Sequence, residues 1–119
     1  MAVFDDVASA AVRTALNGLA MRQRVSANNL ANIETPGFTA GRLDFENQLR
    51  DAVANGSEVE SSVEFAETRS NLAPRQDGNN VNIDEETLSS MDTGLRFKLM
   101  LRAKDDQYGL ISTVLKGGR

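Results

Sequence analysis

The chain has 119 residues, with 13 lysines and arginines against 17 aspartates and glutamates, and it contains no histidine, cysteine or tryptophan. Without histidine or cysteine it cannot form a Ser-His-Asp triad, a Cys–His nucleophile pair or a metal site of thiolates and imidazoles. Its net charge of -4 argues against general nucleic-acid binding, which needs a basic surface. We therefore predict that the protein is not an enzyme, and we expect no catalytic residue, no cofactor and no metal ligand.

The two ends of the chain differ in charge from its middle. Residues 41–90 hold four bases and eleven acids, whereas residues 91–119 hold six bases and three acids. This asymmetry predicts that the ends and the middle serve different roles. The first residues carry acids where a secretory signal carries bases, and no stretch approaches the roughly 18 apolar residues of a membrane span. We expect no cleavable signal peptide and no insertion into a membrane.

A long helix is predicted over residues 3–33. No proline interrupts this segment, and apolar residues recur in it at alternating spacings of four and three, as on one face of a helix. A neighbouring row widens that face and consists of Phe4, Val7, Ala8, Ala11 and Ala15. The helix either packs within its own domain or serves as an assembly helix with neighbours on several sides. The main row, which includes two polar members, Gln23 and Ser26, consists of Val12, Leu16, Leu19, Gln23, Ser26, Leu30 and Ile33.

This helix must end before Pro36, because the residue that precedes a proline prefers an extended backbone. The sequence Thr35-Pro36-Gly37-Phe38 predicts a type II turn. In such a turn Pro36 fixes φ at the second position, and Gly37 supplies the positive φ of the third.

An irregular acidic segment is expected over residues 39–82. Leu43, Phe45 and Leu49 can anchor a short element, and the stretch that follows allows either a short strand pair or a mobile loop. An apparent calcium loop begins at Asp77, but its fifth position is a valine and its twelfth is a leucine instead of a glutamate. We expect a turn there that leads into a helix cap.

A second long helix is predicted over residues 84–116. Asn82 or Asp84 can cap its start, and acids in its first turn favour the positive end of the helix. We divide the chain, as one domain, into an N-terminal assembly helix with its motif (1–38), the middle segment (39–82) and a C-terminal assembly helix (83–119). The residues that we expect to pair the two helices are Leu16, Leu19, Leu30, Leu88, Leu95, Leu101, Tyr108 and Ile111.

These elements predict a mainly α fold in which the long N- and C-terminal helices pair as an antiparallel hairpin or coiled coil, joined by the irregular acidic middle. The most informative stretch runs from Ala27 to Phe38 and holds Asn28, Asn29 and Asn32 near a helix end. Asparagine is a mediocre helix former. These side chains are either exposed amides at a fraying end or a polar interface that bridges neighbouring subunits and fixes their register.

This stretch resembles the N-terminal motif of the axial proteins of the bacterial flagellum, which include the rod and hook proteins. In that family an Ala-Asn-Asn-x-Ala-Asn segment is followed by Thr-Pro-Gly and an aromatic residue. Three further features are similar to the proximal rod proteins of the basal body in particular. They are the short chain, the sequence Leu43-Asp44-Phe45 and the segment from Asp77 to Asn82. The matching positions, our expected assembly motif, are Ala27, Asn28, Asn29, Leu30, Ala31, Asn32, Thr35, Pro36, Gly37 and Phe38.

The resemblance implies a structural subunit that the flagellar type III apparatus exports unfolded, without a cleavable signal. It implies polymerisation through the terminal helices in the periplasmic rod, which helps to transmit torque from the membrane ring to the distal rod and hook. The implied partners are other rod subunits, membrane-ring and rod-adaptor proteins, the export apparatus and further copies of the chain. Three alternatives stay open: another axial protein such as the C-type proximal rod protein, a generic helical adaptor, and a small enzyme, which the residues support least.

Overall fold

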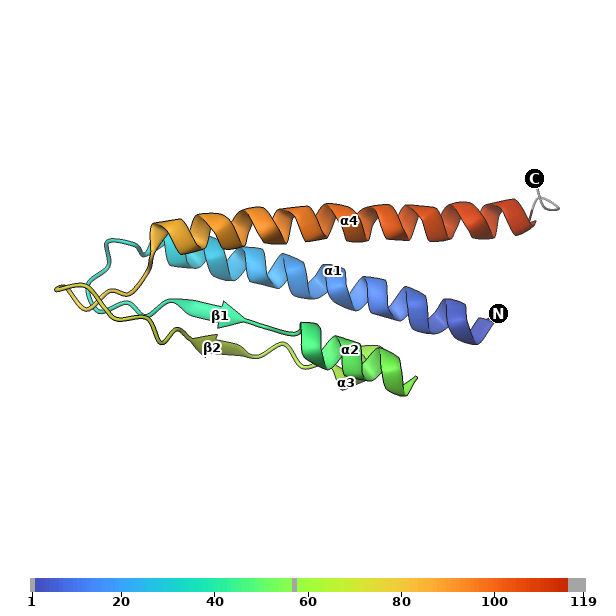
Figure 1. The fold of residues 1–119 in the computed structure, drawn as a ribbon, viewed down its shortest axis with the longest axis horizontal. Helices are drawn as coiled ribbons and strands as arrows, with labels where there is room; N and C mark the ends of the chain where they lie inside the picture. Colours follow the sequence, from blue (N-terminus) through green and yellow to red (C-terminus); the bar gives the residue numbers. More distant parts are fainter. Residues whose placement is uncertain (1, 57, 116–119) are drawn as a thin grey trace.

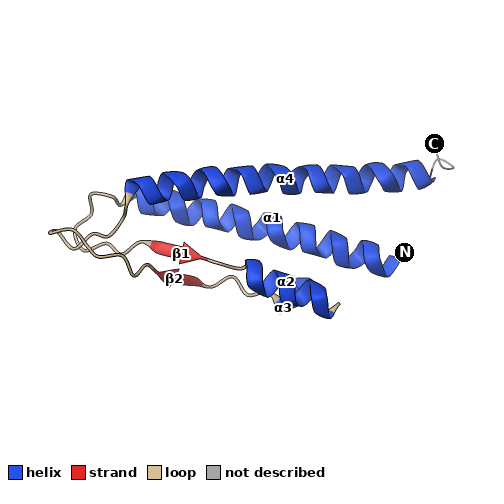
Figure 2. Cartoon of the chain, in the orientation of Figure 1, coloured by secondary structure: helices blue, strands red, loops and turns tan. Residues whose placement is uncertain are grey.

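The structure is a computed structural model that describes residues 2–56 and 58–115, with side chains described for residues 7–56 and 58–106. It is mainly helical, and its two strands are short (Figure 2). In chain order the elements are α1 (Ala2–Ala31), β1 (Gly41–Leu43), α2 (Glu46–Asn55), α3 (Val59–Ser62), β2 (Glu67–Arg69) and α4 (Ile83–Leu115).

The two long helices, α1 and α4, lie side by side and run in opposite directions, so that α1 begins where α4 ends (Figure 1). This arrangement confirms the predicted fold class. Asn82 caps α4, since its side-chain oxygen accepts a hydrogen bond of 3.1 Å from the backbone N–H of Glu85. Acids in the first turn of α4 face the positive end of the helix dipole.

The middle segment forms a strand pair, but not the one that the sequence left open within residues 57–70, because one of its strands lies before that stretch and residues 59–62 are helical. β1 and β2 are antiparallel, with Gly41 opposite Arg69 and Leu43 opposite Glu67. The short helices α2 and α3 lie between the two strands in the sequence. α1 is the central layer, because α4 covers one side of it and β1, α2 and α3 contact it from the other (Figure 1).

The apolar core lies between α1 and this middle segment. Phe45 is only 2% exposed, and its ring meets that of Phe65 edge to face with the centroids 5.6 Å apart. The ring also lies directly on α1 at Gly18, where an added Cβ would come within 2.6 Å of two ring carbons. The middle segment is therefore a part of the fold that α1 needs in order to bury its apolar face. The buried core residues are Ala15, Leu19, Leu43, Phe45, Ala52, Val59 and Val63.

α4 turns a mixed stripe, not its leucine row, toward the rest of the molecule. Leu88 is 67% exposed and Leu95 is 59% exposed. These two predicted pairing residues therefore do not pack on α1 within the chain, which corrects the expected intrachain contact. Glu86 and Thr93, by contrast, are each 1% exposed. The buried and half-buried positions described in α4 include a row at alternating spacings of four and three: Glu86, Ser90, Thr93, Phe97, Met100 and Lys104.

We predict opposite effects for alanine at two helical glycines. Gly18→Ala should destabilise the protein, because the new methyl group must displace the packed ring of Phe45, and overpacking costs about 1–3 kcal/mol. Gly94→Ala meets nothing within 4 Å and should raise the free energy of unfolding by about 1 kcal/mol through helix propensity alone. Urea unfolding of both variants checks this. Equal stabilisation by both would contradict the packing at Gly18.

Candidate functional site

The end of α1 leads into the predicted turn. Gly37 has a φ of +75°, and the N–H of Phe38 donates to the carbonyl of Thr35 at 3.2 Å. These two observations confirm the type II turn. Asn32 stabilises the approach to it, since its side-chain nitrogen donates to the carbonyl of Asn28 at 2.8 Å and its side-chain oxygen accepts from the Thr35 hydroxyl at 3.1 Å. The motif thus terminates the helix and redirects the chain.

The second recognised segment, Asp77 to Asn82, docks directly on this turn. The N–H of Gly37 donates to the carbonyl of Asp77 at 2.8 Å. Gly78 has a φ of +85°, and a Cβ added there would lie 3.2 Å from the Cα of Gly37. Both the backbone conformation and the close approach therefore require glycine. Two segments far apart in the sequence meet here as a pair of interlocked turns.

Asn79 holds these two turns together. Its side chain is fully buried, and its side-chain nitrogen donates to the carbonyls of Asn32 and Thr35 at 2.7 and 2.8 Å. Its side-chain oxygen accepts from the N–H of Val81 at 2.7 Å. Both amide hydrogens and the amide oxygen are thus used, which makes burial of this polar group tolerable.

Asn80 likewise holds together the segment that precedes β1 and the segment that follows β2. Its oxygen accepts from the N–H of Ala40 at 2.7 Å. Its nitrogen donates to the carbonyls of Ser70 and Leu72 at 3.2 and 3.1 Å. One buried side chain therefore satisfies backbone groups before β1 and after β2.

Asn29 joins α1 to β1 and α4. It exchanges two hydrogen bonds with the backbone of Gly41, at 2.9 and 3.0 Å, as a neighbouring strand would. Its nitrogen also donates to the carboxylate of Glu86 at 2.9 Å. We call Asn29, Asn79 and Asn80, with the groups they bind, the amide junction. Both amide hydrogens and the amide oxygen of Asn29 are therefore used by bonds within the chain.

Glu86 explains which face α4 turns inward. Its carboxylate is buried on α4, and Arg42 of β1 donates to it at 2.9 Å while also pairing with Glu85. A buried carboxylate is tolerated only with such partners. Because Asn29 and Arg42 both lie on the α1–β1 side, Glu86 must point there. The leucine row on the other side of α4 is left outward.

A second polar contact ties α1 to the middle segment. Arg22 donates to both carboxylate oxygens of Glu46, at 2.7 and 2.5 Å, and to the carbonyl of Leu43 at 2.8 Å. Its guanidinium lies 5.0 Å from the ring centroid of Phe45. The hydrogen bonds from Arg22 lower the pKa of Glu46 to about 2, against the opposing effect of partial burial.

The structure brings together some of the predicted site residues and separates others. In the motif Asn29 is buried, Asn32 and Phe38 are half-buried, and the remaining positions are exposed: Ala27, Asn28, Leu30, Ala31, Thr35, Pro36 and Gly37. Of the predicted pairing residues, Leu19 is buried and Leu16 half-buried, whereas Leu30, Leu88, Leu95 and Leu101 are exposed. The side chains of Tyr108 and Ile111 lie outside the described residues.

Three charged members of the site were not predicted from the sequence. Arg42 and Glu86 carried no spacing that linked them. Arg75 was not singled out either, although it donates to the carbonyl of Val81 at 2.6 Å and to the carbonyl of Ile33. The one signal in the sequence for this site was the presence of several asparagines in both segments, Ala27 to Phe38 and Asp77 to Asn82. Their amides indicated that each segment needed hydrogen-bond partners.

Nothing in the described part of the chain resembles a metal centre, since no three acidic, histidine or cysteine side chains gather there as metal ligands would. Among the same residues, no helix combines the length and the apolar character needed to cross a bilayer.

Comparison of the sequence with known proteins indicates the family. A family model described as "Flagella basal body rod protein" matches residues 11–39, which run along α1 and through the whole assembly motif. The flagellar basal body rod protein FlgB of Salmonella typhimurium is 31% identical, over 87% of this chain and 89% of that protein. The chain belongs to the FlgB family of flagellar basal body rod proteins.

Two further members show how widely the similarity extends. FlgB of Escherichia coli is also 31% identical over 87% of this chain and 89% of that protein. FlgB of Bacillus subtilis is 27% identical over 91% of this chain and 92% of that protein. The FlgB-like alignment thus extends far beyond the N-terminal motif.

The Arg22–Glu46 pair should make stability depend on pH. The pKa of Glu46 is lower in the folded protein than its ordinary value of 4.5, so the pair stabilises the fold above that value and the stabilisation is lost as the pH falls toward about 2. Glu46→Gln should therefore lower the free energy of unfolding at about pH 7 and have little effect near about pH 2. Urea unfolding across this range measures the difference. Arg22→Gln, which removes the main partner and leaves Arg96 3.2 Å from the carboxylate, should give the same pH dependence with a smaller amplitude, and a pH-independent difference would contradict the pair.

Asn79→Asp tests the amide junction. The substitution keeps the oxygen that Val81 uses but replaces both donors with a carboxylate that faces two carbonyl oxygens in a fully buried site. We expect the free energy of unfolding to fall by more than about 3 kcal/mol at neutral pH. Asn71→Asp, at an exposed position nearby, is the matched control and should change it by less than about 0.5 kcal/mol. Similar effects of both substitutions on urea unfolding would refute the role of Asn79.

Proposed function

We propose that this protein is a structural subunit of the proximal rod of the flagellar basal body, and that it polymerises through its terminal helices. In that role it helps to transmit torque from the membrane ring to the distal rod and hook. Membership of the FlgB family supports the proposal, and so does the paired arrangement of α1 and α4.

The single observation that carries the assembly role is the exposed leucine row of α4. Leu88, Met91, Leu95 and Leu99 are each more than half exposed, although they recur at helical spacing. An exposed apolar patch on a protein surface marks an interaction site. Repetition of one head-to-tail contact by a rotation that does not close generates a filament, which is the form that a rod requires.

We infer partners and location from the same proposal. The subunit contacts other rod subunits, membrane-ring proteins and a rod adaptor, and further copies of itself, in the periplasmic part of the basal body. The flagellar type III apparatus exports it unfolded and without a cleavable signal peptide. The motif from Ala27 to Phe38 contributes to assembly mainly by shaping the end of α1, since Asn29 and Asn32 bond within the chain.

The test compares two exposed leucines. Leu88→Asp should prevent incorporation into basal bodies and abolish swimming, because it places a carboxylate on the face of α4 that we assign to assembly, while folding is spared at a 67% exposed position. Leu72→Asp, at a 39% exposed leucine outside the terminal helices, should swim normally. The measurements are motility in soft agar, the amount of each variant in the periplasm and its presence in purified basal bodies. Absence of the unmodified protein from basal bodies would overturn the proposal.

A further inference from the structure

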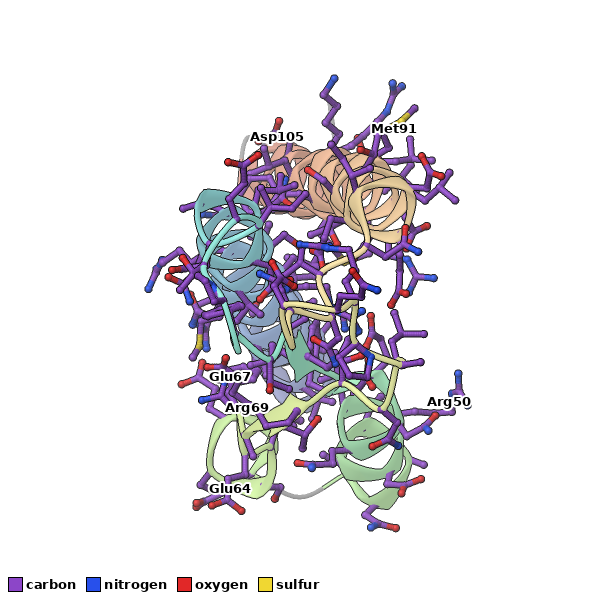
Figure 3. All side chains as sticks on the ribbon, turned by 90° about the vertical axis from the view of Figure 1, so that its left-hand side faces the viewer. Arg50, Glu64, Glu67, Arg69, Met91 and Asp105 are labelled. Carbon is purple, nitrogen blue, oxygen red and sulfur yellow. The ribbon has the colours of Figure 1, made fainter. Side chains whose placement is uncertain are left out.

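The exposed row of α4 forms a continuous ridge. We call Leu88, Met91, Leu95 and Leu99 the outer ridge; their exposed fractions are 67%, 68%, 59% and 54%. At 3.6 residues per turn these positions share one face, opposite the stripe that includes the buried Glu86 and Thr93. Figure 3 shows Met91 on the outer side of α4, far from Glu64 and Glu67 at the opposite edge of the molecule.

Charged residues of opposite sign lie at the two ends of this ridge. Asp84 precedes Leu95 by about three helical turns and Arg102 follows it by about two, so both fall on the same face as the ridge. Both side chains are exposed, and neither forms an ion pair with another described residue. The ridge is therefore apolar in its middle, acidic at its start and basic at its end.

We propose that two copies of this protein pair through the outer ridge as antiparallel α4 helices. In the register that places Met91 of one copy opposite Leu95 of the other, Asp84 of each copy faces Arg102 of its partner copy. Leu88 then lies beside the aliphatic part of Lys98, which can cover apolar surface while its charge stays in water. A parallel pair would instead bring like charges together at both ends, which is unfavourable.

This pairing goes beyond the rod function. A pair of free subunits covers the same face that we assign to rod contacts, so the pair must open before either copy is incorporated. It gives the unassembled subunit a way to keep its apolar ridge out of water.

The absence of cysteine from the chain allows a direct test of the register. Two full-length variants, Met91→Cys and Leu95→Cys, are mixed and oxidised. The antiparallel register brings position 91 of one copy to position 95 of the other, so in an equal mixture the mixed disulfide should exceed either homodimeric disulfide by clearly more than the twofold that random pairing gives. Random proportions, an excess of both homodimeric products (parallel pairing) or an excess of one of them (a shifted register) would each overturn the proposal.

Charge reversal supplies the second test, with the dissociation constant measured by sedimentation equilibrium. Asp84→Arg and Arg102→Asp should each weaken dimerisation by roughly tenfold, because each reverses one member of two symmetric pairs. The double variant should recover the affinity of the unmodified protein, and Glu64→Arg, on the far edge, should leave it unchanged (Figure 3). A monomer at every concentration, or reversals without effect, would overturn the pairing, whereas incorporation into basal bodies tests the rod function separately.

Discussion

Buried asparagine side chains hold the two halves of this chain in place. Between the end of α1 and the start of α4 the chain passes twice through the same small region, and neither passage forms regular helix or sheet there. Backbone groups in such loops need partners when water is excluded. Asn79 and Asn80 supply those partners, binding carbonyls and N–H groups of segments that lie up to 47 residues away in the sequence. The position of α4 relative to α1 depends on these bonds.

The orientation of α4 about its own axis follows from the same junction. Asn29 and Arg42 draw Glu86 inward, and the apolar row on the opposite side of the helix is then left exposed. On the other side of α1, Arg22 and Phe45 fasten the middle segment. The buried apolar residues Ala15 and Leu19 of α1 thus pack within the subunit, whereas α4 keeps one apolar face exposed. That division suits a subunit whose assembly contacts are made by a terminal helix.

The sequence predicts the long elements well because helical periodicity extends over many turns in each. It also predicts the turn at Gly37, where proline and glycine leave few alternatives. It could not predict β1 and β2, since strands of three residues are too short to show an alternating pattern. The inward face of α4 was assigned wrongly because an apolar row is normally the buried one. Here the bonds to Glu86 determine which face of α4 points inward, and no spacing in the sequence predicts these bonds.

The partners of the asparagines were unpredictable for a related reason. Most of them are backbone carbonyls and N–H groups, which every residue possesses, so the sequence carries no mark of which ones will be bound. The motif could indicate that Asn29 and Asn32 have a specific role. Only the fold shows that the side chain of Asn29 forms the two hydrogen bonds with the backbone of Gly41 that a neighbouring strand would form.

Native-state hydrogen exchange on the unmodified monomer tests the amide junction most directly. The N–H groups of Ala40, Gly41 and Val81 lie outside the helices, yet each donates to a buried asparagine oxygen. If the junction holds the helices together, these three should exchange as slowly as the amides around Leu19 in the centre of α1, because they open only when the whole fold opens. Exchange at the rate of exposed loops, with α1 still protected, would contradict the account.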